Sequence, residues 1–576
     1  MRGSVTKAPA LNLPVDKVSL VEVHTRAAVD EHVQPETLVS LELVAAARIV
    51  GEVVSHPTVH LARHAVGLAV RYRREQSFAW CHVGPYSRGS TAAVLQRFPC
   101  VSALRRKVAL RKISVSTVNA QALAENEMIL EEARALPVAG RYDVLVCGGG
   151  TSGVPAAIAA ARAGAKTALV ERYGFLGGVP AYCIMPAWHR LGEGHSRLLA
   201  EFAERVRDVG KGPNPLVTQH MEPECVKMAA LNMACEAGVD IHLHSLICDT
   251  TVEGDRVTGV VTESKSGRRV FLGDVVVDAT GDADVAAGGG ARFMLGDELG
   301  VTQGMTVRFR IGYINFDRYF DWISRNRHYF RDIDDQCISH LRRKAADGET
   351  FYMAADLSPL YRKHPEYPDL PHLSYFNGSS LRRNELSLNA TRVHGLDGTS
   401  EEDLTKAEIE CRKQAFAVWR FLRDNVPGFE DSTIVETAPQ VGVRETRRII
   451  GDYLLTENDC RRGAEFEDTI ARNPISFDLH DKTYSLESLP HSANIPYRCL
   501  LPVGLESILV VGRCISTDHV ANSSVRRMMT AFELGQVGGV AAALAAGRGV
   551  SPRGLPFAVL RVAMTDAGIL TDSDGR

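Results

Sequence analysis

The pattern of apolar and polar positions becomes regular from Tyr142 onward. Residues 143–147 (DVLVC) form a short apolar run, which predicts a buried strand. The Ala-rich stretch 151–163 predicts a helix packed closely on a sheet, Gly164 ends it, and residues 167–170 predict a second buried strand. A strand, a turn, a helix and a strand in this order predict a right-handed βαβ unit.

The same kind of pattern continues downstream and returns near the C-terminus. We expect a helix at about 222–238 and strands at 240–244, 256–264 and 270–278. A further buried strand is expected at 507–512 and a helix at 525–546. Because residues 300–495 mix polar helices with strand-like pieces, the sequence predicts an α/β domain that is interrupted by a large insertion and completed afterwards.

Residues 1–127 do not share this regularity. They contain no Gly-rich loop and no long helical or strand period. Met128, in contrast, opens a stretch that is typical of a protein beginning: a short acidic helix, a turn and then a strand. We therefore predict that residues 1–127 are a poorly ordered extension, or upstream sequence that a misplaced start has included.

Composition narrows the class of protein further. Of 576 residues, 45% are hydrophobic and 23% are charged, which suits a soluble globular protein. The formal net charge of -3 provides no field for polyanions, so no nucleic-acid partner is expected. No apolar run reaches the roughly 18 residues of a membrane span. The 12 cysteines include no CxxC pair, so we expect reduced thiols in a cytoplasmic protein and no metal site.

The motif with the most chemical content is Gly148-x-Gly150-x-x-Gly153, directly after the first predicted strand. The first glycine permits a tight turn, the second lets a pyrophosphate approach the backbone, and the third lets the helix pack on the strand. The helix N-terminus then offers N–H groups to the phosphates. Glu171 follows the first glycine by 171 − 148 = 23 residues and suits ribose hydroxyls, while disfavouring a 2′-phosphate. Together these residues predict a dinucleotide site.

Two further features favour FAD over NAD. Gly177 and Gly178 lie in a loop after the second strand, and the later segment VVVDATGDADVA ends a strand in Thr280-Gly281-Asp282. An extended flavin dinucleotide needs backbone contacts beyond the first βαβ unit, and glycines at strand ends supply them.

Six segments, in this order, resemble the FAD-dependent oxidoreductase family of the glutathione-reductase-like flavoproteins, which includes the FAD domain of the heterodisulfide reductase A subunit. They are YDVLVCGGGTSG, LVERYGFLGG, VVVDATGDADVA, QVGVRETRRIIGDYLLTENDC, IPYRCLLPVGLESILVVGRCIS and RRMMTAFELGQVGGVAAALA. The resemblance runs from about residue 128 to 570, and it is specific for FAD but not for a substrate. It implies an α/β fold with a discontinuous Rossmann-like FAD-binding domain, an inserted mixed α/β substrate or cap domain and a C-terminal tail. Their expected bounds are 128–300 and 496–550 for the FAD-binding domain, 301–495 for the insertion and 551–576 for the tail.

The resemblance also implies the residues that bind FAD non-covalently. These are Gly148, Gly150, Ser152, Gly153, Glu171, Arg172, Gly177, Gly178, Thr280, Gly281, Asp282, Gly512, Arg513 and Gly535. Gly148, Gly150 and Gly153 would hold the pyrophosphate and Glu171 the adenosine ribose.

Near the C-terminus the implied contacts are less regular. Arg513 stands where related flavoproteins place an Asp, and the arginine usual in this family suits an ionic contact with pyrophosphate or flavin. The helix ending in Gly535-Gln536 would direct its N-terminal half at the flavin. Residues 526–530 read Arg-Arg-Met-Met-Thr where the family usually has Arg-Val-Met-Pro-Thr, so a proline is lost and a charge is gained.

Candidates for the reaction itself are protonatable and cationic residues. Asp478 and His480 alternate in a predicted strand, so both could face one cavity and relay a proton. Arg444 belongs to GVRETRRIIGDY, where guanidinium groups suit carboxylates or phosphates, or form a buried network with Glu445. His189 is a further candidate acid or base, with a structural or surface histidine as the alternative.

Four other residues are weaker candidates. Cys183 would be a redox thiol near the flavin, although the missing CxxC partner favours a structural cysteine. Tyr497 and Arg498 precede the final strand of the FAD-binding domain and His519 follows it, so each could touch substrate or flavin.

The sequence therefore predicts an FAD-dependent oxidoreductase that transfers a hydride between a small organic substrate and flavin N5. An FAD-containing electron-transfer subunit of a larger complex is the alternative, and a flavin-stabilised scaffold is a third hypothesis that the charged and aromatic middle region disfavours. The electron acceptor and a homo-oligomeric state stay open.

Overall fold

The computed structural model describes residues 41–44, 68–74, 77–83, 133–185, 195–211, 220–371, 375–380, 384–473, 476–481 and 484–569. The chain divides into two compact units, 1–134 and 135–576. In the first unit the described strands pair antiparallel in the order β1-β2-β3. They are β1 (Leu41–Val44), β2 (Leu68–Arg74) and β3 (Ser77–Val83). Most of the predicted N-terminal extension lies outside the described residues.

The second unit contains a seven-stranded sheet in the order β6-β5-β4-β9-β8-β7, with β21 paired to β9 beside this path. Its strands are β4 (Val138–Cys147), β5 (Thr167–Val170), β6 (Asp240–His242), β7 (Leu246–Glu253), β8 (Arg256–Glu263), β9 (Arg269–Asp278) and β21 (Ile508–Val510). The β4, β5, β6, β9 and β21 pairings are parallel, whereas β7 and β8 join β9 as an antiparallel meander. Ile508 pairs with Val276, so a late segment completes a sheet begun before the insertion, which confirms the discontinuous fold.

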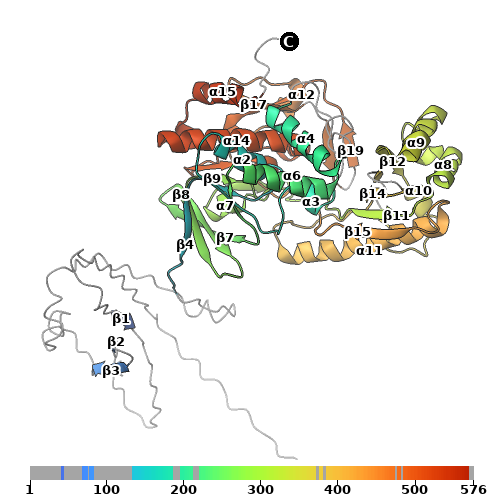
Figure 1. The fold of residues 1–576 in the computed structure, drawn as a ribbon. Coiled ribbons are helices and arrows are strands. Elements are labelled where there is room, and N and C mark those ends of the chain that lie inside the picture. Colours follow the sequence, from blue (N-terminus) through green and yellow to red (C-terminus); the bar gives the residue numbers. More distant parts are fainter. Residues whose placement is uncertain are drawn as a thin grey trace, which may run out of the picture. The chain divides into compact units, whose positions relative to one another are not determined.

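Two Ala- and Gly-rich helices pack against each other and against this sheet (Figure 1). They are α2 (Gly153–Arg162) and α14 (Met528–Arg548). A Cβ at Gly535 would come within 2.0 Å of the Ser152 carbonyl oxygen, and one at Gly539 within 2.1 Å of the Ala156 carbonyl oxygen. The two backbones therefore approach so closely because α14 has no side chains at these two positions.

Helix α14 by length and composition could also cross a membrane, but 89% of its apolar window is buried inside the protein. It is a core helix in this fold. The expected helix at 525–546 corresponds to α14, which begins at Met528, and the residues before it form a separate short helix, α13 (His519–Val525).

The insertion has a core of its own (Figure 1). Its antiparallel sheet has the order β12-β13-β14-β11-β15. The strands are β11 (Phe309–Gly312), β12 (Phe351–Asp356), β13 (Tyr375–Ser380), β14 (Leu386–Asn389) and β15 (Thr433–Thr437). The helices are α8 (Phe316–Arg325), α9 (Asp335–Asp347), α10 (Ser358–Tyr361) and α11 (Glu401–Asn425). Aromatic residues fill its interior, including Phe309, Tyr319, Phe320, Phe421 and Phe429.

The other elements are helices and two-stranded sheets outside these two larger sheets. The remaining helices are α3 (Val179–Tyr182), α4 (Arg197–Gly210), α6 (Pro223–Glu236), α7 (Asp284–Gly288), α12 (Glu457–Arg462) and α15 (Phe557–Asp566). Two-stranded sheets pair β10 (Phe293–Leu295) with β16 (Arg447–Ile449), β17 (Thr469–Asn473) with β20 (Ala493–Pro496), and β18 (Phe477–His480) with β19 (Tyr484–Glu487).

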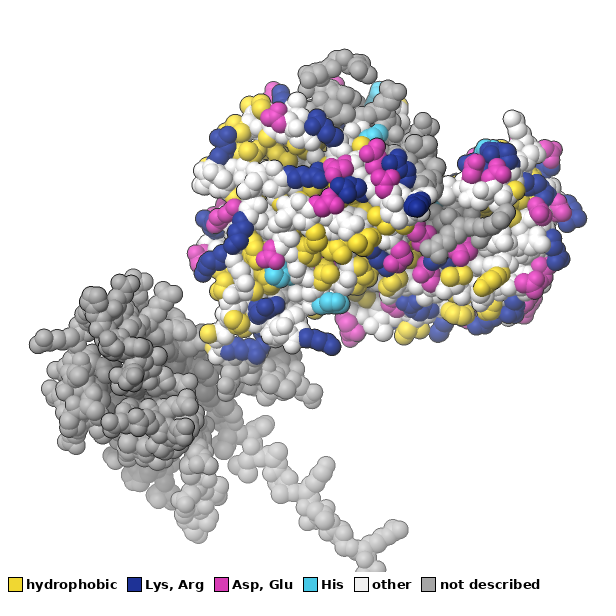
Figure 2. Space-filling view, viewed as in Figure 1, with side chains coloured by type: hydrophobic (Ala, Val, Ile, Leu, Met, Phe, Trp, Pro, Cys, Tyr) yellow, Lys and Arg dark blue, Asp and Glu magenta, His cyan; other side chains and the backbone are white. Residues whose placement is uncertain are grey.

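Basic and acidic side chains are interspersed over the face seen in Figure 2, without a continuous basic patch among the described residues. This distribution agrees with the small net charge. The absence of a nucleic-acid partner and a cytoplasmic location stay predictions.

Candidate functional site

A cavity of about 450 Å³ opens where four strands of the large sheet end. Its lining includes the residues that directly follow three strands: Gly148 after β4, Glu171 after β5 and Ala279 after β9. Gly512, two residues after β21, also lines it. Ligands of open α/β sheets bind outside the carboxyl ends of the strands. The cavity therefore lies where the fold places a cofactor.

The glycine loop forms one wall of this cavity. Gly148 has φ of +102°, a conformation that side chains disfavour, and a Cβ at Gly153 would lie 1.7 Å from the Gly148 carbonyl oxygen. A Cβ at Gly150 would meet only the Gly178 Cα, at 3.9 Å. Gly148 and Gly153 are thus required by the protein itself, whereas Gly150 leaves room beside the backbone for a ligand.

The start of α2 offers hydrogen-bond donors to such a ligand. The side chain of Ser152, the N-cap residue, does not cap the helix. Thr151 Oγ1 is buried, lines the cavity and has no hydrogen-bond partner among the described residues. An uncapped helix start beside an unsatisfied hydroxyl suits a phosphate group.

Glu171 holds the same loop through hydrogen bonds. Its two carboxylate oxygens accept hydrogen bonds from Gly149 N (2.6 Å) and Tyr173 N (2.8 Å). Burial raises the pKa of Glu171, and the two backbone N–H groups partly offset this. Each oxygen keeps a second lone pair, and Glu171 lines the cavity, so it can hold the loop and also accept hydrogen bonds from a ribose.

Eleven of the 14 expected FAD-binding residues line the cavity, and three do not. Gly153 and Gly535 are positions where helix α2 is closely approached by neighbouring backbone. Gly177 has φ of +113° and donates its N–H to Gly149 O at 3.0 Å. Gly535 also lies inside α14 and not at its end, so the expectation that this helix ends there is wrong. Met528, at the helix start, lines the cavity instead.

The guanidinium charge of Arg513 is paired within the protein. Its guanidinium donates to Gly281 O (2.6 Å), to Val443 O and to the Asp282 carboxylate. Burial alone would lower its pKa, but the Asp282 carboxylate raises it, so Arg513 is charged and neutralised within the protein. Its main role in this structure is to join the end of β9 to the segment that leaves the insertion.

Asp478 and His480 lie on β18, and both line the far end of the cavity. His480 Nε2 is 3.1 Å from Asp478 Oδ2, and an Arg392 N–H donates to Nδ1. Because arginine cannot accept a hydrogen bond, Nδ1 is the acceptor and Nε2 carries the proton. Burial and the Arg444 charge lower the pKa of His480 well below its usual value. His480 is therefore a neutral imidazole.

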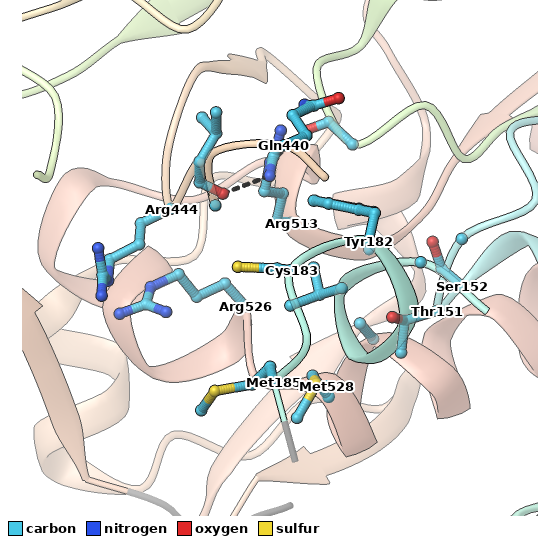
Figure 3. A pocket seen from close by; sticks show the side chains of 18 of the residues that line it. Thr151, Ser152, Tyr182, Cys183, Met185, Gln440, Arg444, Arg513, Arg526 and Met528 are labelled. Carbon is cyan, nitrogen blue, oxygen red and sulfur yellow. Dashed lines mark hydrogen bonds between the residues drawn. The ribbon is translucent and has the colours of Figure 1, made fainter. Parts of the chain in front are cut away.

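Two arginines face the same end of the cavity in Figure 3, Arg444 and Arg526. Arg444 donates to Gly304 O and to Thr306 Oγ1 (2.9 Å), while burial and Arg392 lower its pKa to about 9. Arg526 donates to the Asp478 carbonyl oxygen (2.7 Å), and burial lowers its pKa to about 10.

The structure separates the other candidates from this group. Arg448 and Glu445 form a buried ion pair. His519 Nδ1 lies 2.9 Å from the Glu445 carboxylate. None of these three residues lines the cavity. Tyr497 donates to Pro552 O and Arg498 pairs with Asp468, and neither residue lines the cavity.

The remaining two candidates are Cys183 and His189. Cys183 lines the cavity, but burial raises its pKa, so it is an unreactive thiol at neutral pH. His189 lies outside the described residues.

Sequence reasoning did not single out Arg308 or Arg392, and it noted Arg526 only as a departure from the family pattern. Arg308 is 2% exposed and lines the cavity. In the segment VRFRIG, Arg308 directly precedes an apolar strand. This pattern could have indicated a buried polar site, because arginine is almost never fully buried without a partner.

The fold and this site define a dinucleotide-binding oxidoreductase of the α/β class. The residues present fit FAD, because Gly150 leaves space, Thr151 offers a free hydroxyl and the cavity continues to a group of titratable residues. Residues 143–564 match the model of the family described as FAD dependent oxidoreductase, and the chain belongs to that family. It is accordingly an FAD-dependent oxidoreductase.

Individual relatives are distant. A 70-residue segment is 41% identical to dihydrolipoyl dehydrogenase of Trypanosoma brucei brucei, and it spans 11% of this chain and 15% of that protein. The fold is similar to that of a geranylgeranyl bacteriochlorophyll reductase-like protein from Thermoplasma acidophilum (13% identity, TM-score 0.37, 74% of this chain and 84% of the other). It is also similar to the myxobacterial chondrochloren halogenase CndH (14% identity, TM-score 0.39, 74% and 79%).

Proposed function

We propose that this protein transfers a hydride between a small organic substrate and flavin N5 of non-covalently bound FAD. The observation that carries the proposal is one continuous cavity that joins the glycine loop to His480 and Arg444. FAD bound there would supply the two-electron chemistry, and the chain supplies binding, orientation and proton handling.

The nucleotide end of the cavity would hold FAD through the loop Gly148–Ser152, with the phosphates at the uncapped start of α2. Glu171 would accept hydrogen bonds from the adenosine ribose, and the adjacent Arg172 side chain lies over the Tyr173 ring at 4.9 Å. Gly178 is needed for a different reason: a Cβ there would lie 2.5 Å from Thr151 N and distort the loop.

The other end would handle the substrate proton. His480 keeps a proton on Nε2, where Asp478 fixes it. For Nδ1 to accept a proton, the Arg392 N–H must turn away from it, so proton uptake would be coupled to a movement of Arg392. Arg444 is anchored through Gly304 and Thr306 and would orient the substrate.

Anaerobic reduction tests this proposal. Purified holoenzyme is mixed with candidate dehydrogenase substrates, and flavin bleaching is followed by stopped flow. Removing a positioned acid or base costs about 10²- to 10⁴-fold in rate, so His480→Gln should slow substrate-driven bleaching by that factor and leave bleaching by dithionite unchanged. Arg205→Gln, at an exposed ion pair with Glu236, is the matched control. Flavin that no small molecule reduces, but that a protein partner reduces quickly, would favour an electron-transfer subunit instead.

A further inference from the structure

Besides Arg172 and Arg513, four arginines line the cavity. They are Arg308, Arg444, Arg526 and Arg527. In Figure 3 the guanidinium groups of Arg444 and Arg526 approach the same region, on the opposite side of Cys183 from Thr151 and Ser152. We call these four residues the arginine cluster.

Few acidic groups balance this cluster. The described residues that line the cavity include three carboxylates, Glu171, Asp282 and Asp478. Glu171 accepts hydrogen bonds from the glycine loop and Asp282 is paired with Arg513, so Asp478 is the lining carboxylate that contacts the cluster. Outside the lining, Glu445 also acts on the charge of Arg526. Its Oδ2 lies 3.3 Å from Arg526 and 3.5 Å from Arg527, and it also contacts His480. One carboxylate is therefore shared between two guanidinium groups and an imidazole.

The excess of positive charge is buried. The Arg526 side chain is 12% exposed, and its Nε has no hydrogen-bond partner among the described residues. Burial lowers the pKa of Arg444 to about 9, and the Arg392 charge adds to this. The pKa of Arg526 is likewise lowered, by burial and by Arg527 and Arg444, against the pull of Asp478. Buried guanidinium groups that repel one another are stabilised by an anion that enters between them.

We propose that the substrate of this enzyme is a small organic oxyanion, a carboxylate or a phosphate ester, held between Arg444 and Arg526. Planar, fixed guanidinium groups bind such oxygens in pairs, which would orient the reacting carbon of the substrate. The proposal rests on the proposed function in so far as the bound anion is also the hydride donor or acceptor.

The cofactor phosphates do not account for the cluster. The glycine loop and the start of α2 provide their binding place, at the end of the cavity where Thr151 and Ser152 lie. Arg526 and Arg527 of the arginine cluster instead contact Asp478, which pairs with His480. A small anion bound there would lie beside the only described imidazole that is directly paired with a lining carboxylate.

Binding of simple anions to the FAD-loaded enzyme tests the proposal without requiring turnover. Malonate, inorganic phosphate and the neutral analogue malonamide are each titrated while the flavin difference spectrum and the melting temperature are recorded. We expect saturable binding of malonate or phosphate and at least tenfold weaker binding of malonamide. Response to malonate alone identifies a carboxylate site, and response to both identifies a general oxyanion site.

Variants then assign the site. Arg444→Met and Arg526→Met should each weaken anion binding at least tenfold, Arg444→Lys less, and Arg205→Gln not at all. If a methionine variant does not fold, the lysine variant decides: weaker anion binding with full flavin content supports the proposal, and unchanged anion binding overturns it. Equal binding of malonamide and malonate, or unchanged anion affinity in the arginine variants, overturns the proposal. An altered flavin spectrum in the variants, together with no anion binding, would also overturn the proposal. It would assign the arginines to the flavin.

The two proposals can fail separately. Saturable anion binding in a protein whose flavin no small molecule reduces would keep this inference and reject the proposed function. Rapid flavin reduction by an uncharged substrate, in a protein that binds neither malonate nor phosphate, would keep the proposed function and reject this inference.

Discussion

At the scale of single residues, the glycines of the nucleotide loop differ in what they make room for. Gly153 makes room for the protein, because a Cβ there would penetrate the Gly148 carbonyl group. Gly150 makes room for something else, because no described side chain lies near its Cβ position and its φ is not positive. The same motif therefore contains a folding requirement and a binding requirement at neighbouring positions.

Substitution of these two glycines separates the requirements. Gly150→Ala should lower FAD affinity by about tenfold to a hundredfold while the melting temperature of the apoprotein hardly changes, because its methyl group would enter only the ligand space. Gly153→Ala should destabilise the apoprotein itself, by about 1 to 3 kcal/mol or more. Flavin-to-protein ratio and urea unfolding measure the two effects. A Gly150→Ala protein with full flavin content would contradict the placement of the pyrophosphate.

The sequence could predict part of the site at this scale. Asp478 and His480 are two residues apart, and strand alternation alone predicts that they share a face. Arg392 is 88 residues from His480 and Arg526 is 48 residues from Asp478, so only the folded chain brings these charges together. Spacing reveals local pairs, but the electrostatic environment that decides their protonation is made by distant segments.

At the scale of elements, contact between α2 and α14 depends on glycines of α14. Gly535 and Gly539 are four residues apart and so lie on one face of the helix, next to the backbone of α2. Gly547 lies near the C-terminal end of α14, and apart from its chain neighbours and the backbone of its own helix no described atom lies within 4 Å of its Cβ position.

These positions predict opposite effects of one substitution. Gly539→Ala should destabilise the protein by about 1 to 3 kcal/mol, because the new methyl group would lie 2.1 Å from the Ala156 carbonyl oxygen and push the helices apart. Gly547→Ala should stabilise it by about 0.5 kcal/mol, because alanine loses less backbone entropy in a helix. Equal effects of both in chemical unfolding would show that the helices do not pack as described.

His519 connects three elements through charge. It starts α13, and its ring nitrogens contact Glu445, just before β16, and Asp481, just after β18. Burial alone would lower the pKa of His519, but the hydrogen bonds to Asp481 and Glu445 raise it to about 9. The histidine is therefore a cation at neutral pH.

This raised pKa predicts a pH dependence of stability. The pKa of His519 is higher in the folded protein than its usual 6.5, so its stabilisation is fully present below about pH 6.5 and is lost as pH rises toward 9. Allowing for solvent screening, about 1 to 2 kcal/mol should be lost over this range. The difference in unfolding free energy between wild type and His519→Gln, measured by urea unfolding at several pH values, should shrink accordingly. A difference that grows with pH would contradict the charged state.

The strands and helices of the nucleotide-binding part were largely predictable because their apolar runs are long and closely follow the periods of buried elements. Strand β7 was not predicted, since its sequence LICDTTVE is half polar and lies at an edge of the sheet, where its side chains are partly or fully exposed. The strand order of the insertion was not predictable either. Its strands are short, and their pairing is set by the aromatic core that α8 and α11 complete.

At the scale of the whole molecule, the described residues that line the cavity all fall between Gly148 and Ala531, inside the second compact unit. The family match begins at residue 143 and agrees with this limit. The part of the chain that precedes Met128 is therefore expected to contribute nothing to FAD binding.

Shortening the chain tests this expectation. Protein expressed from Met128 should bind FAD with the same stoichiometry and melt at the same temperature as the full chain, because no described cavity residue is removed. Absorbance of the purified proteins and differential scanning calorimetry make the comparison. Loss of flavin together with a lower melting temperature would show that the first 127 residues support the enzyme.

The pairing of β21 with the carboxyl end of β9 also determines when the enzyme can acquire its cofactor. During synthesis β9 leaves the ribosome early, but its partner strand emerges only after the whole insertion has been made. Gly512, Arg526 and Met528, which help to enclose the cavity, emerge later still. The nascent chain thus has a glycine loop long before it has a closed pocket, and FAD can be retained only when translation is nearly finished.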